Sequence, residues 1–166
     1  IETVSDDFVL RNKHIECKSP TIFRDNPASL LEMFVLIAHR EDVVGVSAST
    51  IRLIRESLNL IDENYRQNPK HTQLFMRLLK APYKVVTQLT RMRRYGVLAR
   101  YIPEFGQIVG QMQHDLFHIY TVDAHTMMVI GNMRRFRYPE AKTQTPLAHH
   151  CVCLLYTSPS PRDRLK

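Results

Sequence analysis

The segment NPASLLEMFVLIA, residues 26–38, decides the fold class. Asn26 followed by Pro27 is a typical helix start, because asparagine caps the first turn and proline fits its first position. The apolar residues that follow recur every three or four positions, as on one broad helix face; they are Leu30, Leu31, Phe34, Val35, Ile37 and Ala38. The segment therefore predicts a helix that packs into a core.

Similar start and stop signals predict further helices along the chain. They are a capping serine at Ser47 or Ser49, a second Asn-Pro pair at residues 68–69, Gly96 as a helix end, Pro103 as a start, and Thr121 as a cap with Asp123 in the first turn. Gly106 and Gly110 indicate either a close helix approach or an irregular loop. Strand-type alternation is nearly absent, and only residues 8–10 suggest a short strand. We therefore expect an all-α fold.

Composition limits the class of protein. The 166 residues suffice for one ordinary domain, and 44% are hydrophobic, which excludes wholesale disorder. No apolar run approaches a membrane span, so we expect no membrane contact. The three cysteines have no zinc-type spacing and are expected to be reduced thiols in a cytoplasmic protein.

The formal charge of +7 fits an acidic partner, nucleic acid or simple solubility. The basic residues look scattered, without the clustered stripe and interleaved aromatic residues typical of nucleic-acid binding. We therefore do not expect nucleic acid as a partner.

The two ends of the sequence suggest a fragment. The chain begins without methionine, and residues 153–166 show neither helical nor strand periodicity. This tail resembles the conceptual translation of a sequencing-library adapter, so we expect it to be non-native and the authentic sequence to break off near residue 152.

Histidines concentrate in one short stretch. His114, His118 and His125 fall within twelve residues, together with Asp115 and Asp123. His114 and His118 are four apart, so on a helix they share a face and are able to hold one metal ion, although structural histidines have the same spacing. The adjacent His114-Asp115 pair does not fit a hydrolase His-Asp motif, because no apolar helix precedes it.

A longer pattern carries a family resemblance. The stretch YGVLARYIPEFGQIVGQMQHDLFH, residues 95–118, is followed by YTVDAHT at 120–126 and MRRF at 133–136. Upstream, residues 7–12 and 48–56 belong to the same pattern. Together these segments closely resemble the bacterial bifunctional uridylyltransferase/uridylyl-removing enzymes, and the resemblance covers roughly residues 2–148.

The resemblance implies a parent enzyme that transfers UMP from UTP to the PII signal protein and hydrolyses it off again in response to glutamine. It divides the chain into a helical linker, residues 1–113, and the truncated start of an HD-type hydrolase domain, residues 114–152. His125 matches the first metal ligand of that domain, which uses a divalent ion such as Mg²⁺ or Mn²⁺ to activate water. The other ligands and the nucleotidyltransferase site lie outside this sequence, so the isolated chain is expected to be inactive.

Several roles remain open. His114, His118 and Asp123 are possible lining residues of the hydrolase site. Three arginines, at positions 134, 135 and 137, suit either a phosphate or acidic PII surface, or simply a solvated helix end. The competing interpretation of the whole chain is a non-catalytic helical interaction or linker module.

Overall fold

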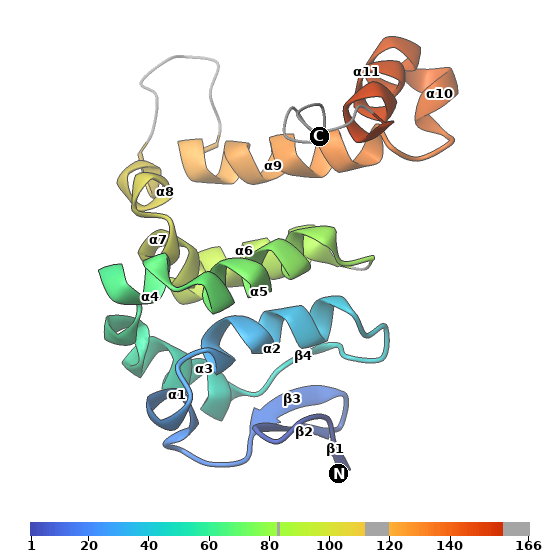
Figure 1. Ribbon diagram of the computed structural model, residues 1–166. Helices are drawn as coiled ribbons and strands as arrows, with labels where there is room; N and C mark the ends of the chain where they lie inside the picture. The colour runs from blue at the N-terminus through green and yellow to red at the C-terminus, as the bar shows by residue number, and fades with distance from the viewer. Residues whose placement is uncertain (83, 112–119, 158–166) are drawn as a thin grey trace, which may run out of the picture. The chain divides into compact units, whose positions relative to one another are not determined.

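The computed structural model describes residues 1–82, 84–111 and 120–157 (Figure 1). The chain divides into two compact units, Ile1–Val109 and Gly110–Lys166. The helices of the first unit are α1 (Ile22–Asp25), α2 (Ser29–Ala38), α3 (Ala48–Glu56), α4 (Glu63–Gln67), α5 (Pro69–Lys80), α6 (Val85–Tyr95), α7 (Val97–Tyr101) and α8 (Pro103–Ile108), with a 3-10 turn at Leu58–Leu60. Those of the second are α9 (Val122–Arg135), α10 (Ala141–Gln144) and α11 (Pro146–Thr157).

A small sheet adds to the expected helices. Its strands, in spatial order, are β1 (Glu2–Thr3), β2 (Phe8–Arg11), β3 (His14–Cys17) and β4 (Gly45–Val46). The first three are antiparallel, and β4 pairs with β3 in parallel. Asn12 and Lys13 form the β2–β3 turn at φ 49° and 63°, the left-handed conformation that suits a two-residue hairpin. The described part of the chain is thus mostly helical, as expected, and it contains one small four-stranded sheet in addition to the helices.

Helix α2 forms the centre of the first unit. Eight of its ten residues are buried, which matches a helix that is apolar around most of its circumference. Figure 1 shows α2 between the sheet and the layer formed by α5 and α6. On the sheet side, the rings of Phe8 and Phe23 lie 6.4 Å apart, and on the helical side Phe34 lies 6.3 Å from Tyr95. The core of this unit is therefore built around the segment that predicted it.

The start of α2 differs from the prediction. The helix begins at Ser29 rather than Pro27, and Asn26 does not cap it. Instead the Asn26 side chain donates a 2.8 Å hydrogen bond to the carboxylate of Asp7, and the Ser29 hydroxyl donates to the same oxygen. The Asp7 carboxylate, just before β2, thus competes with the helix backbone for the Asn26 side chain. A hydrogen bond to a charged group is the stronger of the two.

Other predicted boundaries are confirmed. Ser47 caps α3 by accepting from the Thr50 backbone N–H at 3.3 Å, and Asn68 caps α5 with Pro69 as first residue. Gly96 ends α6 in the left-handed conformation, with φ 89°. Gly106 permits the close approach of α8 to α7, since a Cβ there would lie 2.9 Å from the carbonyl oxygen of Ala99.

The second unit is organised around α9. Its N-cap residue Thr121 has extended backbone but makes no side-chain capping bond. The Val122 N–H donates to the Gln111 carbonyl at 2.9 Å instead. Helix α11 includes residues 153–157, for which we expected no periodic structure, whereas residues 158–166 lie outside the described part. A helix once nucleated at Pro146 extends at little cost per residue, which accounts for this difference. Across the described ranges, we find no helix with the length and hydrophobicity needed to cross a bilayer.

Candidate metal-ligand site on α9

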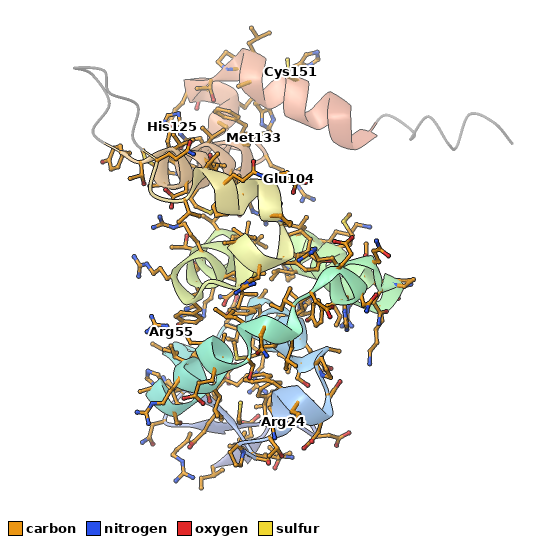
Figure 2. The ribbon with its side chains drawn as sticks, turned by 90° about the vertical axis from the view of Figure 1, so that its left-hand side faces the viewer. Arg24, Arg55, Glu104, His125, Met133 and Cys151 are labelled. Atoms are coloured by element: carbon orange, nitrogen blue, oxygen red, sulfur yellow. The ribbon has the colours of Figure 1, made fainter. Side chains whose placement is uncertain are left out.

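His125 lies in the first turn of α9, with an exposed side chain (Figure 2). Its backbone N–H donates to the Thr121 carbonyl at 2.9 Å, the first hydrogen bond of the helix. A first-turn position fixes the backbone while leaving the imidazole free to face solvent or an incoming group. The structure thus places His125 in the first turn of a helix, as the sequence predicts.

Asp123, the acidic candidate of this site, is placed differently from His125. Its side chain is 2% exposed, and its Oδ1 accepts a 3.2 Å hydrogen bond from the Gly110 backbone N–H. Residues two apart on a helix are rotated by about 200° from one another, so Asp123 and His125 lie on opposite sides of α9. The structure therefore does not bring these two side chains together.

An apolar stripe continues from His125 along the same face of α9. Val129 and Met133 follow at four and eight positions, and they are 42% and 52% exposed. Figure 2 labels His125 and Met133 on this helix. Side chains at this spacing lie one above another on a helix. Exposed apolar residues arranged in a row, rather than singly, are typical of a surface that another element covers.

The remaining histidine candidates, His114 and His118, lie outside the described residues. Within the described ranges, no three His, Cys, Asp or Glu side chains gather closely enough to hold a metal ion. His125 alone supplies one imidazole, and one ligand does not retain a divalent ion against water. The described residues therefore do not by themselves fit a bound metal.

The arginines after His125 lie at the far end of the helix. Arg134 and Arg135 are in the last turn of α9, about 14 Å along its axis from His125. Arg137 follows beyond the helix and is exposed. This separation keeps them apart from the imidazole, while their position at the C-terminus complements the helix dipole.

One histidine with a defined contact was missed by the sequence reasoning. His149 Nδ1 donates to the Phe136 carbonyl oxygen at 2.6 Å and so ties α11 to the end of α9. The two residues are 13 apart, and no local motif marks the pair. It links α11 to the end of α9 within the second unit.

The comparisons with known proteins consist of a profile match within the first unit and similar proteins that cover most of the chain. The profile described as "Uridylyltransferase GlnD third domain" matches residues 8–101. The "Bifunctional uridylyltransferase/uridylyl-removing enzyme" of Ectopseudomonas mendocina is 50% identical over 145 residues, 87% of this chain and 16% of that protein. The enzyme of the same name from Azotobacter vinelandii is 49% identical over 152 residues, 92% of this chain and 17% of its own length.

A third relative, from Acinetobacter baumannii, is 45% identical over 147 residues, covering 89% of this chain and 17% of that enzyme. The chain thus spans about one sixth of the length of the curated relatives that it matches. No solved structure matches it. The identities and the profile match agree with each other, and the chain belongs to the family of bifunctional uridylyltransferase/uridylyl-removing enzymes, whose GlnD third domain it contains.

Proposed function

We propose that this chain is the part of such an enzyme in which the helical third domain leads into the domain that removes UMP. The similar proteins are named for both activities, uridylyl transfer and uridylyl removal. The complete enzyme would transfer UMP from UTP to the PII protein and remove it again in response to glutamine, in the cytoplasm. The chain itself would contribute a scaffold and one side of the hydrolase site.

The observation that carries the proposal is the position of His125. It stands at the start of α9, exposed, at the head of the apolar stripe formed by Val129 and Met133. Elements that cover this stripe would exclude water along it and bring further ligands beside the imidazole. We propose that His125 is then one ligand of a divalent ion, Mg²⁺ or Mn²⁺, whose remaining ligands come from outside the described residues.

The other candidate residues have different roles in this proposal. Asp123 is buried and bonded to the Gly110 N–H, so it acts by fixing the start of α9 and thereby the direction of His125. His114 and His118 remain proposed lining residues of the same site. The isolated 166-residue chain would bind metal weakly and hydrolyse no UMP–tyrosine bond.

The second candidate function is a non-catalytic helical linker or interaction module. It is favoured by the lack of a metal-binding cluster within the described ranges. Under this alternative, His125 is an ordinary solvent-exposed residue of a capped helix, and its replacement affects neither activity of the parent enzyme.

A chimera separates the two functions. The Azotobacter vinelandii enzyme would carry residues 1–152 of this chain in place of its own aligned segment, and both transfer of UMP to PII and its removal would be measured. We expect His125→Ala to lower UMP removal at least 100-fold, within the range that loss of catalytic-site groups produces, while leaving UMP transfer within twofold.

The matched control is His150→Ala, which removes another exposed histidine of the second unit, on α11. It should leave both activities unchanged. Equal UMP removal by the His125→Ala chimera and its parent would instead support the linker function.

A further inference from the structure

Positive charge is concentrated in one part of the first unit. Residues 64–103 carry nine basic side chains and no acidic one, whereas residues 1–63 carry seven basic and eleven acidic. The basic stretch covers α5, α6 and α7. Because like charges repel, a stretch without any carboxylate of its own is less stable than a mixed one. The excess of positive charge is therefore confined largely to residues 64–103, and the basic residues are less evenly scattered than expected.

Three of these nine side chains make contacts that anchor neighbouring segments. Arg66 pairs with Glu63 at 2.8 Å and also donates to a backbone carbonyl of α7. Lys84 donates to two carbonyl oxygens of the loop before β4, each at 2.8 Å, and Arg91 donates to the Val44 carbonyl of the same loop at 2.6 Å. These contacts hold α4 against α7 and the loop before β4 against α6. They give these three cations a structural role.

Five others are exposed and carry their charge toward solvent. None of the four ion pairs found among the described residues includes them. They are Lys70, Arg77, Lys80, Arg94 and Arg100. Side chains of this kind are available to a partner without first breaking an internal ion pair.

The most defined group lies on the outer side of α5. His71, Leu74 and Leu78 form the buried side of this helix. Arg77 and Lys80 are exposed at i, i+3 spacing, and Met76 beside them is 44% exposed. We call Met76, Arg77 and Lys80 the α5 face. It offers two cations around a flexible apolar side chain of the type that adapts to varied protein surfaces.

We infer that the α5 face binds an acidic protein segment, with carboxylates on the two cations and an apolar contact on Met76. Single-stranded nucleic acid would need exposed aromatic rings on which bases stack. The aromatic residues described nearby pack against one another instead, with ring centroids 5.0 Å apart for Phe75 and Tyr101 and 6.3 Å for Tyr65 and Tyr101. The inference does not depend on His125 or on either enzymatic activity.

The test uses the 166-residue chain and fluorescein-labelled poly-L-glutamate, with binding followed by fluorescence anisotropy at about 20 and 150 mM salt. The variant Arg77→Glu/Lys80→Glu reverses both charges of the α5 face. The matched control is Arg52→Glu/Arg55→Glu on α3, which changes the net charge equally at the same i, i+3 spacing (Figure 2 labels Arg55).

We expect the α5 variant to weaken binding roughly tenfold or more and the α3 control less than twofold. Circular dichroism checks that each variant is folded. Should the charge reversal unfold the chain, Arg77→Gln/Lys80→Gln is measured instead, with an expected loss of about threefold.

Three results would overturn the inference. The first is no binding of poly-L-glutamate by the unaltered chain at low salt. The second is an equal loss in the α5 variant and the α3 control, which would mean that net charge alone is responsible. The third is tighter binding of a DNA duplex that the α5 variant abolishes, which would make this surface a nucleic-acid site.

Discussion

The Asp123 carboxylate accepts a hydrogen bond from the Gly110 backbone N–H at 3.2 Å, and this contact joins the start of α9 to the first residue of the second unit. The carboxylate is buried, and it lies in the first turn, where negative charge is favoured by the helix dipole. Because Thr121 provides no side-chain cap, Asp123 is the first-turn side chain that anchors this end of the helix.

Replacement of Asp123 should therefore loosen α9. We expect Asp123→Ala to destabilise the second unit by about 1–3 kcal/mol, because the hydrogen bond from the Gly110 N–H to a buried carboxylate is lost. Hydrogen exchange of residues 122–135, followed by mass spectrometry, measures the change. Asp123→Asn keeps an acceptor oxygen and should cost less. Unchanged exchange in Asp123→Ala would contradict an anchoring role.

The two glycines at the end of the first unit and the start of the second should respond differently to substitution. Gly106→Ala places a Cβ 2.9 Å from the Ala99 carbonyl oxygen, and overpacking of this kind costs about 1–3 kcal/mol. Gly110 has φ 74° with open space around it, so Asn, which tolerates left-handed backbone, should be accepted there. Thermal unfolding of Gly106→Ala and Gly110→Asn compares the two, and equal midpoints would contradict the close α7–α8 contact.

Cys17 should be a poorly reactive thiol. Burial raises its pKa from 9.0 to about 11, with a contact to Thr50 opposing the shift. The folded protein thus favours the neutral thiol, and this contribution to stability is present below pH 9 and lost as the pH rises toward 11. In a Cys151→Ser/Cys153→Ser variant, the rate of alkylation should still rise about tenfold per pH unit at pH 10. A rate that levels off above pH 10, as expected for the unfolded chain with its ordinary pKa of 9.0, would show that Cys17 is an ordinary thiol.

Local stability should differ between the two units. Eight of the ten residues of α2 are buried, whereas α9 buries only Asp123 and Met127 of its fourteen. Amides in elements with few buried contacts open more readily. We expect residues 120–138 to exchange faster than the helices before Pro103, and equal protection throughout the chain would contradict this expectation.

Much of the helical fold was predictable because its signals are local. Ser47, Asn68 and Gly96 act on backbone groups within a few residues of themselves, and the structure confirms all three. The start of α2 was not predictable, because the Asn26 side chain bonds to Asp7, 19 residues away, instead of capping its own helix. Strands β1 and β4 have two residues each, which is too short for alternation to appear in a sequence.

The candidate site was predictable only in part, for a similar reason. The position of His125 at a helix start follows from Thr121 and the local pattern. The burial of Asp123 depends on Gly110, 13 residues earlier, and no motif encodes that contact. The His149–Phe136 bond is also a tertiary contact without a local signal.

The most direct test of the central claim is metal binding through His125. Mn²⁺ titration of the Azotobacter vinelandii chimera, followed by electron paramagnetic resonance, reports bound ions without requiring activity. We predict that His125→Ala removes one class of bound Mn²⁺ or weakens it 10- to 100-fold or more, while His150→Ala leaves the titration unchanged. Identical titrations for the His125→Ala chimera and its parent would contradict the claim that His125 is a metal ligand.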